Sequence, residues 1–257
     1  MSPRLCLLAA AIAAAGAGPM IAAARSSSAM ADAASKLLTS LTPEQRQQAT
    51  FAFDSDERTH WHFIPTETFP RQGLLLRSMT DAQRTLARDL MKAGLSQRGY
   101  ATAAAIMDLE TVLKALEAAQ RAAGPQPPRG QALERDAEKY FVSIFGAPSA
   151  RETWGWRVEG HHVSLHFTVV KGQMVASSPS FFGTNPAEVR EGPKKGLRIL
   201  GAEEDAARAL LETLDASQRA KAIIETTAPG DMITMANVTV TPLSPSGLDA
   251  TAMTVAP

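Results

Sequence analysis

Alternation of apolar and polar residues marks one β-rich region of the chain. The clearest stretch alternates about every second residue, which is typical of a strand with one buried face. Its apolar members are Val163, Leu165, Phe167 and Val169. The same pattern occurs just upstream at 154–158, and Lys171-Gly172 is a turn signal that leads into a short segment at 173–176. The pattern therefore predicts three consecutive strands, arranged as an antiparallel meander around residues 154–176.

Helical periodicity accounts for much of the remaining chain. Apolar residues at helical spacing predict helices over 81–93, 98–122 and 202–214. Three helix starts share a Thr or Asp followed three residues later by Gln, the arrangement of a capping box. The caps are Thr42, Thr80 and Asp215, with Gln45, Gln83 and Gln218 as their partners. We therefore expect an α+β fold, with a small antiparallel sheet packed against several capped helices.

The first 31 residues have the form of a secretory signal peptide. Arg4 precedes an apolar run at 5–15, and a stretch of small residues follows. The run is interrupted by glycines and a proline before it reaches the roughly 20 apolar residues of a membrane anchor, and no later segment is long enough to span a bilayer. The sequence thus predicts an exported protein, periplasmic or extracellular, with no membrane association once the signal is removed.

Two positions in this leader satisfy the small-x-small rule for signal cleavage. One is Ala22-Ala23-Ala24 before Arg25, and the other is Ala29-Met30-Ala31 before Asp32. The second position is preferred, which predicts a signal peptide at 1–31 and one α+β domain at 32–257. A Gly- and Pro-rich stretch at 124–130 then reads as a surface loop within that domain.

Composition excludes several classes of protein. The 26 basic residues balance 26 acidic ones and form no basic stripe, so the sequence argues against a nucleic-acid partner. A single cysteine excludes a disulfide scaffold and a thiolate zinc finger. Phosphate-binding loops and nucleophile-elbow motifs are absent from the sequence. A small-molecule substrate or ligand is the partner that remains, and composition does not indicate the oligomeric state.

Clustering of the histidines is the most informative chemical feature. All five histidines fall in two windows, at 60–62 and at 161–166. Imidazole is a good ligand for Zn, Cu or Fe, and a metal needs donors that converge from distant segments. His62, His161 and His162 are the candidate metal ligands. Because 161 and 162 are adjacent in the predicted strand, they must point to opposite faces, so one of them has a structural role.

Two further interpretations of these histidines stay open beside a metal site. A metal-free pocket could use His162 with Glu159 as acid and base, and the histidines could also be purely structural. Ser164 shares a strand face with His166, where a hydroxyl at the rim of the core is favoured over a nucleophile. Arg157 shares a face with Glu159, which predicts a surface ion pair or an anion-binding arginine.

Five ordered motifs make the chain similar to a known family. They are SLTPEQR at 40–46, WHFIP at 61–65, GLSQRGY at 94–100, WGWRVEGHHVSL at 154–165 and FFG at 181–183. Together they resemble an uncharacterised family of bacterial and fungal proteins, domain of unknown function 3500. The resemblance implies an exported protein and carries no reaction. It also implies that the family continues beyond this chain, so we expect a C-terminal segment of the family to be missing.

Two hypotheses about function follow from these observations. The first is an exported enzyme, metal-dependent or based on His/Glu acid-base chemistry, that acts on a small polar substrate such as a peptide, ester or sugar. Its catalytic residues would be Glu159, His162 and Arg157, its substrate-binding residues Trp61, Trp154 and Trp156, and its metal ligands His62, His161 and His162. The alternative is a periplasmic ligand- or metal-binding module without catalysis.

Overall fold

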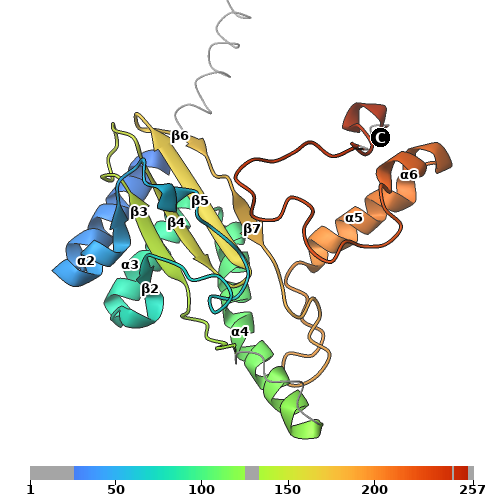
Figure 1. The fold of residues 1–257 in the computed structure, drawn as a ribbon, viewed down its shortest axis with the longest axis horizontal. Helices are drawn as coiled ribbons and strands as arrows, with labels where there is room; N and C mark the ends of the chain where they lie inside the picture. Colours follow the sequence, from blue (N-terminus) through green and yellow to red (C-terminus); the bar gives the residue numbers. More distant parts are fainter. Residues whose placement is uncertain (1–25, 125–132, 245, 254–257) are drawn as a thin grey trace, which may run out of the picture. The chain divides into compact units, whose positions relative to one another are not determined.

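The computed structural model describes residues 26–124, 133–244 and 246–253 (Figure 1). The chain divides into two compact units, Met1–Pro186 and Ala187–Pro257, where the sequence analysis expected one domain over 32–257. Nearly all of the predicted loop at 124–130 and most of the predicted signal peptide lie outside the described residues.

The first unit is built on a mixed sheet, which has seven strands among the residues described. The strands are β1 (Thr50–Phe51), β2 (Leu74–Leu75), β3 (Phe141–Phe145), β4 (Trp154–Gly160), β5 (Val163–Val170), β6 (Gln173–Ala176) and β7 (Ser180–Phe182). Their order is β1-β3-β4-β5-β6, while β2 pairs with β3 and β7 pairs with β5. Among these described strands, only the β1–β3 pair is parallel. The α+β class and the predicted β4–β5–β6 meander are confirmed, and the other four strands enlarge the sheet.

Strand register gives this sheet two chemically different faces. Trp156 of β4 lies opposite Ile144 of β3 and Phe167 of β5, so apolar side chains from three strands share one face. One residue further along β4, Arg157 lies opposite Ser143 and His166 on the other face. Because side chains alternate along a strand, one face of the sheet is apolar and the other is polar.

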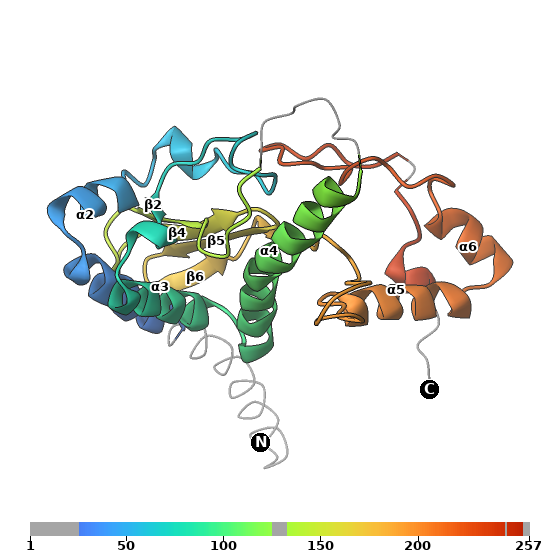
Figure 2. The same ribbon diagram turned by 90° about the horizontal axis from the view of Figure 1, so that it is seen from below.

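Helices cover the apolar face. They are the helical segment 26–40 together with α3 (Asp81–Gly94) and α4 (Gln97–Ala123), while α2 (Pro43–Ala49) lies near the sheet edge at β2 and β3 (Figure 2). Trp156 stacks on Phe167 with ring centroids 4.2 Å apart, and both rings pack against Gly94 at the end of α3. The absence of a side chain at Gly94 lets the helix approach the rings closely.

Each predicted capping box is present. Thr42, Thr80 and Asp215 accept hydrogen bonds from the backbone N–H groups of Gln45, Gln83 and Gln218. The predicted helices at 81–93 and 98–122 correspond to α3 and α4 within one residue at each end. In the second unit, α5 (Gly201–Thr213) matches the prediction at 202–214, and α6 (Ala216–Ala222) and the 3-10 turn η3 (Ala250–Ala252) follow.

A helix that crosses a bilayer needs about 20 predominantly apolar residues. Within residues 26–124, 133–244 and 246–253, none is both long enough and apolar enough to cross a membrane.

Candidate functional site

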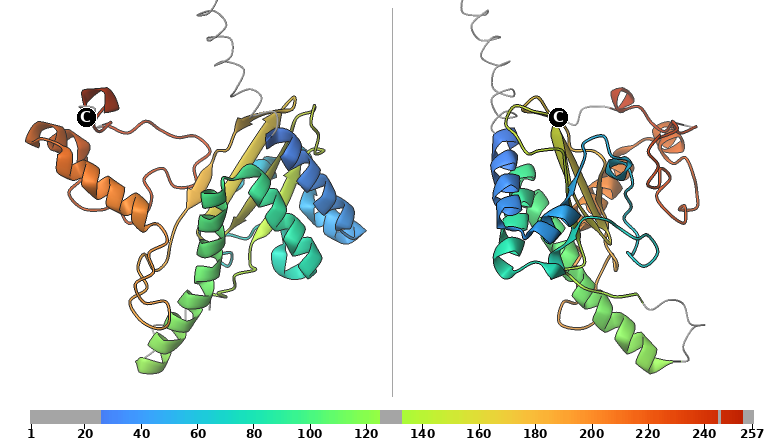
Figure 3. Two further views of the ribbon diagram at one scale, coloured as in Figure 1. Left: turned by 180° about the vertical axis from the view of Figure 1, so that it is seen from behind. Right: turned by 60° about the vertical axis from the view of Figure 1, so that its left-hand side comes forward.

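The segment at 52–73 covers the polar face of the sheet, on the side opposite the helices (Figure 3). Arg157 is fully buried beneath it, and its Nη1 donates to the carbonyl oxygens of Glu57 and His60, each at 2.8 Å. Its Nη2 lies 2.5 Å from the Glu57 carboxylate and 2.9 Å from that of Glu159. The predicted ion pair between Arg157 and Glu159 therefore exists, but in the interior and not at the surface.

A second arginine holds the same segment from within. Arg71 donates to the carbonyl oxygens of His62 and Ile64, each at 2.7 Å, and its Nε lies 3.7 Å from Glu159 Oε2. That carboxylate also accepts the backbone N–H of His62 at 3.3 Å. Burial raises the pKa of Glu159, although the charges of Arg157 and Arg71 act in the opposite direction.

This burial changes the roles expected of Arg157 and Glu159. Both residues have no exposed surface, and their polar atoms contact each other and the backbone of the covering segment. A general base or an anion-binding arginine has to reach its substrate. In this conformation, the two side chains instead fasten the segment to the sheet.

A buried serine–histidine pair lies further along the same face. Ser164 Oγ is 3.0 Å from His166 Nε2. The ring of Trp61 meets the imidazole edge-on, with the two ring centroids 5.4 Å apart. Burial, together with the nearby charges of Arg157 and Arg58, lowers the pKa of His166 to about 3. The ring is therefore neutral at ordinary pH, and the pair agrees with the expected core hydroxyl.

The three predicted substrate-binding tryptophans do not form one wall. Trp154 and Trp156 are 0% and 1% exposed on the apolar face, whereas Trp61 packs against His166 on the polar face. Alternation along β4 separates Trp154 and Trp156 from Arg157 and Glu159 by the thickness of the sheet. The pocket expected from these residues together is thus not formed.

His161 and His162 form the turn between β4 and β5. The sequence analysis had placed both of them within a strand, and this prediction was wrong. His162 has a φ of 63°, in the left-handed region that a tight hairpin turn requires, and its N–H donates to the Phe63 carbonyl at 2.8 Å. Tyr140 anchors the turn through a 2.7 Å hydrogen bond from its hydroxyl to the His161 carbonyl. The close approach of Tyr140 requires Gly160, because any Cβ there would lie 2.4 Å from the tyrosine ring.

The three predicted metal ligands contact different partners. His62 Nδ1 accepts hydrogen bonds from the N–H groups of Phe63 and Ile64, at 2.9 and 3.3 Å. Across the described part of the chain, no group of three or more His, Cys, Asp or Glu side chains is arranged to hold a metal ion. His62, His161 and His162 are thus not assembled as a three-ligand set, because the turn and the covering segment direct them to different partners.

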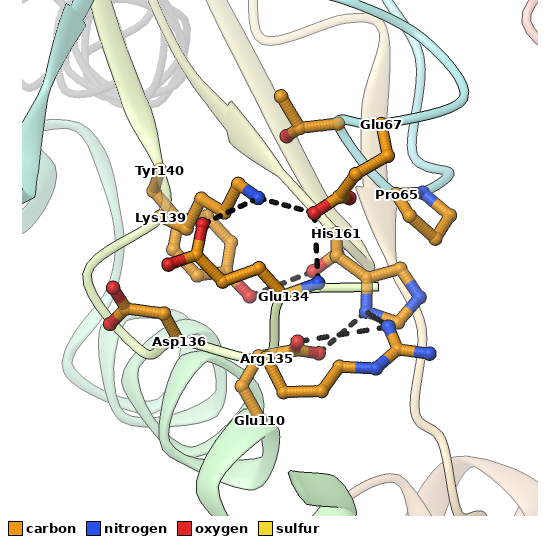
Figure 4. Close-up of a pocket in the computed structure, with 10 residues that line it drawn as sticks. Pro65, Glu67, Glu110, Glu134, Arg135, Asp136, Lys139, Tyr140 and His161 are labelled. Carbon is orange, nitrogen blue, oxygen red and sulfur yellow. Dashed lines mark hydrogen bonds and ion pairs between the residues drawn. The ribbon is translucent and has the colours of Figure 1, made fainter. Parts of the chain in front are cut away.

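One predicted residue, His161, lines a small polar hollow with room for about one water molecule, about 10 Å³. The hollow lies where the β4–β5 turn meets α4, the segment before β3 and the segment at 52–73 (Figure 4). Its lining residues are Pro65, Thr66, Glu67, Glu110, Glu134, Arg135, Asp136, Lys139, Tyr140 and His161.

Two charged side chains converge on His161 Nδ1. Glu110 Oε1 lies 2.5 Å from this nitrogen and Arg135 Nη1 lies 3.2 Å from it, as Figure 4 shows. A carboxylate oxygen at 2.5 Å requires a shared proton, because two lone pairs at that separation repel each other. A proton on Nδ1 that is donated to Glu110 leaves Nε2 as the acceptor nitrogen of the ring. Arg135 has only N–H donors, so its contact with a protonated Nδ1 is electrostatic and is not a second hydrogen bond.

The partners of Glu110 and Arg135 hold this arrangement in place. Arg135 is also bonded to Glu117, through Nη2 at 2.8 Å and Nε at 3.1 Å, so its guanidinium is fixed beside the imidazole. Its Nη1 lies 3.9 Å from Glu110 Oε2. The side chains of Glu110 and Arg135 are 7% and 6% exposed, while that of His161 is 11% exposed. The contact between His161 Nδ1 and Glu110 is therefore shielded from water, and only the edge of this pair is exposed.

The opposite wall of the hollow is an ion-pair network. Lys139 Nζ lies 2.5 Å from Glu67 and 3.0 Å from Glu134. Hydrogen bonds from Arg77 and Lys139 lower the pKa of Glu134 to about 2. The lining holds four carboxylates against two cations, Arg135 and Lys139, and both cations are already paired. The hollow is therefore acidic in character.

Sequence analysis found His161 but missed Glu110 and Arg135. Glu110 lies on the inward face of α4 with Ile106 and Leu113, and a carboxylate at helical spacing among apolar residues was a detectable signal. Arg135 follows the Gly- and Pro-rich stretch, where no periodicity indicates which side chains turn inward.

Comparisons with known proteins place this α+β chain in a family. It matches the family described as "Protein of unknown function (DUF3500)" over residues 23–256, and it belongs to that family. This confirms the resemblance that the five motifs carry. No curated protein and no solved structure matches the chain.

Proposed function

We propose that this protein is an exported acid-base enzyme that acts on a small polar organic substrate, with His161 as its general base. The proposal rests on one observation, the 2.5 Å contact between His161 Nδ1 and Glu110 at the edge of a polar hollow. In this arrangement Glu110 fixes the ring and its tautomer, and Nε2 takes a proton from the attacking group.

Hydrolysis is the reaction that suits the hollow. There is room for about one water molecule, which is the smallest reactant that a general base activates. His161 would accept a proton from that water as its oxygen attacks an ester, peptide or glycosidic carbon. The C–O or C–N bond to the leaving group then breaks, and the protonated imidazole returns the proton to the leaving oxygen or nitrogen. The larger part of the substrate would then lie outside the hollow, against the exposed margin of the turn.

Charge around the hollow favours a neutral or cationic substrate. The carboxylates outnumber the cations, and both Arg135 and Lys139 already have carboxylate partners. An anionic substrate would have to displace one of these pairs. Arg157, which the sequence analysis assigned to an anionic group, is buried against Glu57 and Glu159.

Export remains part of the proposal on sequence grounds. A positive residue, an apolar run and small residues at two cleavage positions are the features of a signal peptide. The enzyme would then act in the periplasm or outside the cell.

A substrate panel tests the proposed activity. The purified exported protein would be assayed against neutral and cationic chromogenic esters, aminoacyl anilides and glycosides, with anionic analogues in parallel. We expect turnover of at least one neutral or cationic substrate, and a fall in kcat of about 100-fold or more in His161→Gln. His60→Gln is the matched control, because His60 is half-exposed and lies outside the hollow.

Three results would argue against this assignment. An unchanged kcat in His161→Gln would remove the proposed base. A loss of activity in His60→Gln as large as in His161→Gln would make the effect nonspecific. Saturable binding of a panel compound without turnover would favour the alternative of a ligand-binding module.

A further inference from the structure

The helical segment at 26–40 is part of the core of the first unit. Ser27 and Met30 have no exposed surface, and Ala31 is 4% exposed. The indole N–H of Trp156 points at Met30 Sδ, 3.3 Å away, on the apolar face of the sheet. Ser26 Oγ also donates to the carbonyl oxygen of Ala93 near the end of α3, at 3.4 Å.

These contacts distinguish the two cleavage positions in the leader. Cleavage after Ala31 would remove Ser27 and Met30 and leave Trp156 facing a void. Cleavage after Ala24 would keep the whole described length of this segment. Both positions satisfy the small-x-small rule, so the sequence rule alone does not separate them.

We propose that the exported chain is processed between Ala24 and Arg25, so that the mature protein begins at Arg25. This departs from the cleavage before Asp32 that was preferred in the sequence analysis. The core contacts of Met30 carry the inference, and the family match, which begins at residue 23, independently places residues 25–31 within the family's common region. The proposal rests on export, which is part of the proposed function.

The test uses the full chain, expressed with its own leader in a bacterial host that has a signal peptidase. The protein is recovered from the periplasm and the medium, and its N-terminus is determined by intact mass and N-terminal sequencing. We expect Arg25 as the first residue.

Two matched variants separate the cleavage positions. Ala24→Leu places a bulky residue directly before the proposed cut, and we expect more than 90% of the processed product to be lost. Ala29→Leu places the same residue three positions before the alternative cut. Ala29 is exposed on its helix, so this variant is expected to fold and to be processed at Arg25 as before.

A stability comparison provides a second measurement. Chains that begin at Arg25 and at Asp32 are produced without a leader, and their thermal unfolding is compared. Loss of the buried Met30 is expected to lower the Tm of the shorter chain by about 10 °C. Equal melting temperatures would overturn the packing argument.

The outcomes separate this proposal from export itself. An exported chain that begins at Asp32, or one that keeps its leader, overturns the cleavage position and leaves export intact. A chain that stays in the cytoplasm with its leader overturns both.

Discussion

His166 shows how far burial can displace a titrating residue from its ordinary behaviour. It lies beneath Trp61 and beside Ser164, and its pKa falls from 6.5 to about 3, first through burial and then through the nearby charges of Arg157 and Arg58. The unfolded chain takes up a proton on this imidazole below pH 6.5, whereas the folded chain does so only near pH 3. Stability therefore falls as the pH drops through this window.

His166→Gln tests this linkage. Gln keeps a hydrogen-bonding group near Ser164 but does not titrate. Between pH 6 and pH 4, the free energy of unfolding of the native protein should fall more steeply than that of the variant, by about 1.4 kcal/mol per pH unit. Urea unfolding at several pH values measures both slopes, and parallel slopes would contradict the buried neutral state of His166.

At the scale of elements, the sequence predicted those features that local chemistry determines. Thr80 and Gln83 form their capping box because a hydroxyl and an amide three residues apart satisfy the free N–H groups at any helix start. The β4–β5–β6 meander was predicted from the alternation of apolar and polar residues. Positions 161–162 were assigned to a strand because the hydrogen bond from Tyr140 that anchors their turn is a long-range contact, which no local pattern reveals.

Packing of α3 on the sheet depends on Gly94. A Cβ at this position would lie 2.6 Å from the Trp156 ring and 3.0 Å from that of Phe167. Gly94→Ala should therefore lower the free energy of unfolding by about 1–3 kcal/mol, because the stacked rings have little room to shift.

Gly124→Ala is the matched control, since Gly124 follows the last residue of α4 and a Cβ there meets nothing within 4 Å. We expect a change of less than about 0.5 kcal/mol in this variant. Equal effects at Gly94 and Gly124 in urea unfolding would refute the proposed close packing of α3.

At the scale of the whole molecule, long-range contacts decide where chemistry is possible. The sequence correctly indicated that Arg157 and Glu159 share a face, but it did not show that residues 52–73 cover that face. The candidate catalytic residue is instead His161, whose partners Glu110 and Arg135 lie 51 and 26 residues away in the chain. Such convergence depends on the topology of the fold, which local patterns do not encode.

The division into two units predicts that the first one folds by itself. It contains the entire described sheet, the helical segment at 26–40 and the helices α2, α3 and α4. A chain of residues 25–186 should therefore show a near-ultraviolet circular dichroism spectrum and a single cooperative thermal transition. A broad transition without near-ultraviolet signal would contradict this prediction.

Whether Glu110 holds His161 as a base is visible in the protonation of the imidazole ring. Long-range proton–nitrogen NMR spectra of the ¹⁵N-labelled protein at pH 8, with His161→Gln for assignment, distinguish the two neutral tautomers. We expect a proton on Nδ1 and a bare Nε2 in the native protein, with this preference lost in Glu110→Ala and kept in Glu67→Gln. A proton on Nε2 in the native protein, or an Nδ1 preference that survives in Glu110→Ala, would contradict it.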